Sequence, residues 1–190
     1  MEHAAKQPEP VFLPQLSTRR SMTFPSSVRR LDLLLPMRLT DLLQPEAVFA
    51  SLRANSKKQV LQELSDRAAH IAHLPERQIF DAVLQRERLG STGIGNGIAI
   101  PHAKLAKCPS ITGVFARLEK PIDFEAIDAV PVDLVFLLVA PESAGADHLK
   151  ALARIARVLR DPAITAKLRA IHDPAALYAI LTQEPTSHAA

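Results

Sequence analysis

Apolar residues recur at helical spacing in two stretches of the first half of the chain. Ser56 is a plausible N-cap for the first helix, because a serine hydroxyl can accept a hydrogen bond from the amides of the first turn. The apolar positions that follow it are Val60, Leu61, Leu64, Ala68 and Ile71. A second helix is predicted from Pro75 to Arg88, with Gly90 just past its end. Its apolar stripe consists of Ile79, Phe80, Val83 and Leu84.

The middle of the chain changes to patterns that are typical of strands. A short strand is predicted from Gly97 to Ile100, directly before a histidine. A second strand is predicted from Ile111 to Leu118, where apolar and polar residues alternate weakly. Residues Val130 to Val139 are almost continuously apolar, as expected of a central strand that is buried on both faces.

Helical periodicity returns in the last part of the chain. A long helix is predicted from Asp147 to Arg160, and its apolar positions are Leu149, Leu152, Ile155, Val158 and Leu159. The pairs Asp161-Pro162 and Asp173-Pro174 each resemble an N-cap followed by proline at the first helical position, so two shorter helices are predicted there. Helices before and after a few strands indicate a layered α/β domain.

The two ends of the chain differ from this central part. Residues 1–37 hold five prolines and no clear periodicity, which predicts a poorly ordered N-terminal extension. One folded domain is expected from residue 38 to residue 185, followed by a short C-terminal tail, 186–190. The extension carries five basic and three acidic residues, whereas the other 153 residues carry 18 basic and 17 acidic ones.

Composition excludes several classes of protein. The single cysteine, Cys108, excludes an internal disulfide and fits a cytoplasmic location. No run approaches the ~20 apolar residues that a membrane span requires, so no membrane insertion is expected. The net charge of +3 is not gathered into a basic helix interleaved with aromatic residues, so no nucleic-acid binding is expected.

The most distinctive segment runs from Leu89 to Ala103 and places a glycine-rich stretch directly before Ile100-Pro101-His102. Glycines let backbone amides approach an anion closely, proline restricts the backbone that enters the histidine, and a neutral imidazole is a good nucleophile toward a phosphoryl group. The segment is not a P-loop, because no Gly-Lys-Ser/Thr follows, and its glycine spacing differs from the dinucleotide fingerprint. It therefore predicts phosphate chemistry at His102 without a nucleotide.

This segment closely resembles the phosphohistidine site of the fructose/mannitol-type enzyme IIA domains of the bacterial sugar phosphotransferase system, and most of all the nitrogen-regulatory enzyme IIA proteins. The resemblance covers roughly residues 38–184, with its strongest blocks at Arg86–Leu105, Phe124–Pro141 and His148–Arg160. It implies a mixed β-sheet flanked by helices on both faces. It also identifies residues 38–185 as a phosphotransferase system IIA type-2 domain.

The resemblance implies roles for three residues. His102 is expected to carry the phosphoryl group on Nε2. Arg86 matches an active-site arginine whose planar guanidinium grips phosphoryl oxygens, although by itself it reads as a solvated arginine at a helix end. His148 matches the second histidine of the family, and it shares a helical face with Leu152 and Ile155, which turns it toward the core or a cleft. A partly buried structural histidine is the alternative reading for His148.

The implied function is that of a phosphocarrier. It takes a phosphoryl group from a phosphorylated HPr-like carrier and acts as a regulatory switch on target proteins. Two alternatives stay open: a sugar-transport IIA component that passes the group to a fructose- or mannitol-type IIB, and a binding protein with a degenerate site. No cofactor is expected, and no metal, because the remaining histidines lack supporting ligands at metal-binding spacing.

Overall fold

A computed structural model describes residues 37–183 of the chain. The predicted extension, apart from Met37, and the tail 186–190 lie outside the described residues. The helices are α1 (Lys57–Ala72), α2 (Glu76–Arg88), α3 (Gly145–Leu159), α4 (Pro162–Ala170) and α5 (Pro174–Thr182), with short 3₁₀ turns η1 (Leu39–Asp41) and η2 (Glu142–Ala144). The strands are β1 (Leu43–Leu52), β2 (Gly93–Gly95), β3 (Ile98–Ala99), β4 (His102–Leu105), β5 (Thr112–Ile122) and β6 (Val132–Pro141).

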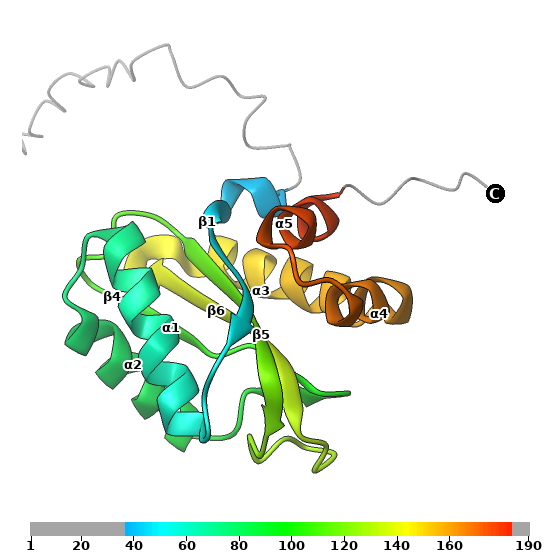
Figure 1. The fold of residues 1–190 in the computed structure, drawn as a ribbon. Coiled ribbons are helices and arrows are strands. Elements are labelled where there is room, and N and C mark those ends of the chain that lie inside the picture. The colour runs from blue at the N-terminus through cyan, green and yellow to red at the C-terminus, as the bar shows by residue number, and fades with distance from the viewer. Residues whose placement is uncertain (1–36, 184–190) are drawn as a thin grey trace, which may run out of the picture. The chain divides into compact units, whose positions relative to one another are not determined.

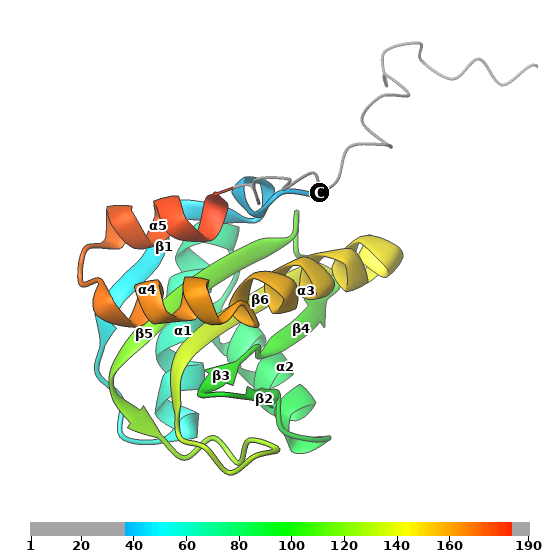
Figure 2. The same cartoon turned by 90° about the vertical axis from the view of Figure 1, so that its right-hand side faces the viewer.

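The six strands form one mixed sheet with β6 near its centre. β5 runs antiparallel to β6 along one edge and pairs in parallel with β1 on its other side. Helices α1 and α2 cover one face of the sheet, and α3, α4 and α5 cover the other (Figure 1, Figure 2). The predicted mixed sheet with helices on both faces is confirmed. No helix within residues 37–183 is long and apolar enough to cross a membrane.

The apolar run predicted as a central strand is the core of the molecule. Every residue from Leu134 to Ala140 is fully buried. Such burial follows from helices on both sides of the sheet, because neither face of this strand meets water. The largest fully buried side chains around it include Phe115, Phe124 and Phe136.

The helix starts predicted from the sequence are also confirmed. The Ser56 hydroxyl accepts a hydrogen bond from the amide of Gln59, and the Asp161 and Asp173 carboxylates accept from amides in the first turns of α4 and α5. These caps satisfy amides that have no partner within the helix. They explain why both Asp-Pro pairs mark helix starts.

One strand on the other edge of β6 is divided into two by a proline. β3 pairs in parallel with Leu134 and Val135, and β4 pairs in parallel from Leu138 onward. Pro101 lies between them and has no N–H to donate, so the ladder is interrupted, although its carbonyl still accepts from the amide of Leu138 at 2.9 Å. The prediction ended the strand at Ile100, but the structure continues it through the histidine to Leu105.

Two further strands were not predicted. β1 contains Pro45 and Glu46, which interrupt its apolar alternation, and its position depends on pairing with β5. β2 lies inside the glycine-rich stretch and forms a short antiparallel hairpin with β3. The turn between them places Asn96 and Gly97 at positive φ, a conformation that glycine adopts without steric cost.

Gly113 in β5 offers a test of how tightly the sheet centre packs. A Cβ at this position would lie 2.7 Å from Cε1 and 2.8 Å from Cζ of Phe136. We expect Gly113→Ala to lower the free energy of unfolding by about 1–3 kcal/mol, as overpacking of a core does. Urea denaturation measures the change. The double variant Gly113→Ala/Phe136→Leu should lose less than the sum of the two single variants, and strict additivity would show that the contact is unimportant.

Candidate active site

The three residues predicted for the site come together from three separate elements. His102 is the first residue of β4, Arg86 lies in the last turn of α2, and His148 lies near the start of α3. Nε of Arg86 is 3.2 Å from Nε2 of His102. The ring centroids of His102 and His148 are 5.6 Å apart, with the rings tilted by 51°. The predicted constellation is therefore formed by the fold.

Hydrogen bonds fix the tautomer of His102. Its Nδ1 is 2.8 Å from the carbonyl oxygen of Ile100, and because a carbonyl can only accept, the proton must lie on Nδ1. Nε2 then carries the lone pair and accepts the hydrogen bond from Arg86. Pro101 stands between Ile100 and His102 and limits the backbone that sets this contact. The arrangement leaves Nε2 as the nucleophilic nitrogen.

The surroundings favour the neutral form of His102. Burial lowers the pKa of the His102 imidazole, the Ile100 carbonyl opposes that effect, the Arg86 cation lowers the pKa further and the Glu87 carboxylate raises it. The net shift is downward from the ordinary value of a histidine. A larger share of the imidazole is thus unprotonated near neutral pH, which a nucleophile requires.

His148 is more deeply buried than His102. Its side chain is only 5% exposed, and its Nε2 has no hydrogen-bond partner among residues 37–183. Burial, followed by the nearby charges of His102 and Lys104, lowers the pKa of His148 to about 4. The imidazole is therefore neutral at physiological pH. The prediction that His148 faces the core side of its helix agrees with this position.

The two histidines and Arg86 line an open groove of about 450 Å³. Its other lining residues are Ala82, Gln85, Leu89, Ala103, Lys104, Leu149 and Leu152. Leu89 and Leu149 are 82% and 66% exposed and add apolar surface beside the polar side chains. Sequence reasoning placed Leu149 in the apolar stripe of the helix and did not single out Leu89 or Lys104. These residues line the groove only because the fold brings the end of α2, β4 and α3 together, which no local sequence pattern shows.

Three amides of the glycine-rich stretch are already paired within the protein. The amide of Thr92 donates to Glu87, that of Gly93 donates to the Ser91 hydroxyl, and that of Asn96 donates to Asp128. These three amides are thus satisfied within the protein and are not free to bind an anion. Gly93 instead permits close packing, since a Cβ there would lie 2.7 Å from Cβ of Ala126.

Comparison with known proteins places this site in a family. The model of the family described as "Phosphoenolpyruvate-dependent sugar phosphotransferase system, EIIA 2" matches residues 41–184. The chain belongs to this family. Members are in general phosphotransferases, and the resemblance noted in the sequence is confirmed.

Several relatives of this IIA chain are named nitrogen regulatory proteins. The one from Bradyrhizobium diazoefficiens is 58% identical over 153 residues, covering 80% of this chain and 100% of the relative. The one from Escherichia coli is 44% identical over 147 residues, covering 77% of this chain and 90% of the relative. The crystal structure of nitrogen regulatory protein IIA-Ntr from Neisseria meningitidis superimposes with a TM-score of 0.73 at 33% identity, covering 76% of this chain and 99% of that one. The chain is thus a IIA-Ntr-like protein.

Within residues 37–183, the IIA chain has no group of three or more His, Cys, Asp or Glu side chains arranged to hold a metal ion. Cys108 is buried, and its thiol donates to the carbonyl oxygen of Ser110 at 3.0 Å. Burial raises the pKa of this thiol above its ordinary value. These surroundings do not activate it as a nucleophile.

The low pKa of His148 leads to a pH dependence of stability. The imidazole takes up a proton near pH 4 in the folded IIA chain but near 6.5 when unfolded. The unfolded chain binds more protons between these values, so the free energy of unfolding should fall as the pH drops from about 6.5 toward 4. His148→Gln removes this contribution, and urea titrations across the window should show a shallower slope than for the wild type. Equal slopes would mean that folding does not shift the pKa of His148.

Proposed function

We propose that His102 accepts a phosphoryl group on Nε2 from the phosphohistidine of a nitrogen-type HPr-like carrier, and that this cytoplasmic chain acts as a phosphorylation-dependent regulatory switch. The observation that carries the proposal is the hydrogen bond from Nδ1 of His102 to the Ile100 carbonyl. It presents a neutral Nε2 at the edge of an open groove. That is the geometry an imidazole needs to attack a phosphorus atom.

The transfer exchanges one P–N bond for another. Nε2 of His102 attacks phosphorus in line while the bond to the carrier's imidazole breaks. The electron pair of that bond stays on the carrier, whose ring leaves as neutral imidazole because its other nitrogen is protonated. His102 becomes a phosphoimidazolium that keeps its proton on Nδ1. The Ile100 carbonyl, which already accepts that proton's hydrogen bond, stabilises the positive charge that develops on the ring.

Arg86 and His148 would stabilise the phosphoryl oxygens. Arg86 Nε donates to Nε2 of His102 before the reaction, so this hydrogen bond must shift to a phosphoryl oxygen as the new bond forms. Its Nη1 is anchored on the Gly90 carbonyl at 3.0 Å, which keeps the guanidinium at the groove. A neutral His148 can donate from its ring to another oxygen. Arg86 thus exchanges one hydrogen-bond partner for another, and His148 gains one.

The groove surface suits a transient protein partner. Exposed Leu89 directly follows the end of α2, and exposed Leu149 lies on α3. Apolar anchors around a polar centre fit a carrier interface of about 1,000 Å². Phosphorylation of His102 then adds about two negative charges at the centre of this surface, which changes its affinity for a regulatory target.

The central experiment is phosphoryl transfer from a phosphorylated HPr-like carrier, followed by intact mass. Wild type should gain one phosphoryl group and His102→Ala none, because the ring carries the acceptor nitrogen. His70→Ala is the matched control, since His70 lies exposed on α1 away from the groove and its loss should leave transfer intact. Transfer to His102→Ala would place the acceptor elsewhere, and no transfer to wild type would favour a degenerate binding protein.

The regulatory role is tested by the choice of partner. The chain is 58% identical to a nitrogen regulatory protein and 34% identical to the fructose-specific EIIABC component of Bacillus subtilis. This difference supports the regulatory role over sugar transport. The chain spans 23% of that fructose-specific relative. We expect faster phosphorylation by a nitrogen-type carrier than by a sugar-type carrier, and no onward transfer to a fructose-type IIB. Efficient onward transfer would establish the transport role instead.

A further inference from the structure

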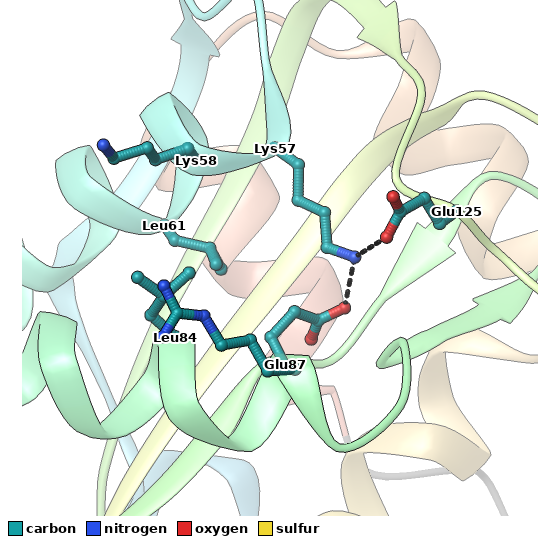
Figure 3. Close-up of a pocket in the computed structure, with 7 residues that line it drawn as sticks. Lys57, Lys58, Leu61, Leu84, Glu87 and Glu125 are labelled. Carbon is teal, nitrogen blue, oxygen red and sulfur yellow. Dashed lines mark hydrogen bonds and ion pairs between the residues drawn. The ribbon is translucent and has the colours of Figure 1, made fainter.

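A buried carboxylate lies next to the site but does not point into it. Glu87 follows Arg86 in the last turn of α2, and its side chain is about 3% exposed. A carboxylate in such a position is stable only when its oxygens are well paired. Lys57 Nζ lies 2.8 Å from Oε1 of Glu87 and also contacts Glu125, as Figure 3 shows.

Within residues 37–183, the other hydrogen bonds to the Glu87 carboxylate all come from Thr92. The Thr92 amide donates to both carboxylate oxygens, at 3.0 and 3.1 Å, and the Thr92 hydroxyl donates to Oε2. Thr92 is itself buried. The carboxylate therefore holds both the backbone and the side chain of the residue that opens the β2–β3 hairpin.

From Thr92 the contacts continue to the reactive ring. The Thr92 carbonyl accepts a hydrogen bond from the amide of Ile100 at 3.0 Å. The Ile100 carbonyl in turn accepts from Nδ1 of His102 at 2.8 Å. Three hydrogen-bonded steps thus connect the Glu87 carboxylate to the imidazole without any direct contact between them.

Glu87 also influences the hydrogen bond at Nε2, the other nitrogen of the His102 ring. It is the neighbour of Arg86 in α2, and Arg86 donates to Nε2 of His102. The segment between Glu87 and Thr92 is short, so their hydrogen bonds fix the end of α2 against the hairpin. We call the pair Glu87 and Thr92 the clamp. It holds both the Arg86 donor at Nε2 and the Ile100 carbonyl acceptor at Nδ1.

We propose that Glu87 is a positioning residue for phosphoryl transfer: through Thr92 it holds the Ile100 carbonyl and Arg86 on opposite sides of the His102 ring. The inference rests on the proposed function, since it concerns the presentation of Nε2. Lys57 balances the buried negative charge. Burial acts to lower the pKa of Lys57, but its hydrogen bonds with Glu125 and Glu87 outweigh burial and raise it.

The test separates positioning from simple stabilisation by measuring two properties of folded variants: the rate of phosphoryl transfer and the tautomer of the His102 ring. Thr92→Val removes the hydroxyl donor but leaves the carboxylate, whereas Thr92→Ser keeps the hydroxyl. We expect Thr92→Val and Glu87→Gln to lower the rate of transfer at saturating carrier by about 10–100-fold, with little change in KM. Thr92→Ser should restore most of the rate. The matched control is Glu125→Gln, which breaks an ion pair with the same lysine but has no contact with Thr92, and should transfer like the wild type.

Nitrogen-15 NMR of the His102 ring supplies a readout that is independent of transfer. Wild type should show a single tautomer with the proton on Nδ1, and Thr92→Val and Glu87→Gln should show a mixture. Glu87→Gln should also lower the pKa of His102, because the Glu87 charge raises it. Folded Thr92→Val with wild-type transfer and a wild-type tautomer would overturn the inference, even if Glu87→Gln fails to fold. If wild type accepts no phosphoryl group, the proposed function fails, while the tautomer measurement still decides whether the clamp positions the ring.

Discussion

The hydrogen bond between Nδ1 of His102 and the Ile100 carbonyl fixes the tautomer of the imidazole around which the candidate site is arranged. An imidazole has two similar nitrogens, and only a fixed acceptor on one of them makes the other a dependable nucleophile. The acceptor here is a backbone carbonyl on the strand that Pro101 interrupts. Because β3 and β4 both pair with β6, in which residues 134–140 are fully buried, the carbonyl is held next to the core of the sheet.

The interruption at Pro101 is therefore part of the site. Proline removes one donor from the ladder and restricts the backbone between Ile100 and His102, where the Ile100 carbonyl accepts the hydrogen bond from the ring. The carbonyl of Pro101 still pairs with Leu138, so the strand resumes at the histidine.

The end of α2 and the start of α3 complete the site from the two faces of the sheet. Arg86 contributes a cation at Nε2, and His148 contributes a buried neutral ring 5.6 Å away. Burial and the Arg86 charge both lower the tendency of His102 to become protonated. The hydrogen bond to the Ile100 carbonyl and the negative charge of Glu87, one residue from Arg86, oppose that effect.

Local patterns were enough to predict much of this protein. The helices follow from apolar spacing and from Ser56, Asp161 and Asp173 at their starts, because caps and amphipathic faces are encoded within a few residues. The segment around His102 also identified the family, and its resemblance proposed His102, Arg86 and His148 as the residues of the site. Strands β1, β2 and β4 escaped prediction because their residues, such as Pro45 or Gly93, have low strand propensity and depend on distant partners.

The sequence by itself determined the order of the helices and the central apolar strand, and through its resemblance to a family it proposed three site residues, which the fold brings together. Only the tertiary structure decided that the amides of Thr92, Gly93 and Asn96 are occupied, that His148 is buried with a pKa of about 4, and that Glu87 binds Thr92. The reason is physical. Periodicity and capping act between near neighbours in the chain, whereas burial, charge–charge interaction and hydrogen-bond partners depend on which elements the fold brings into contact.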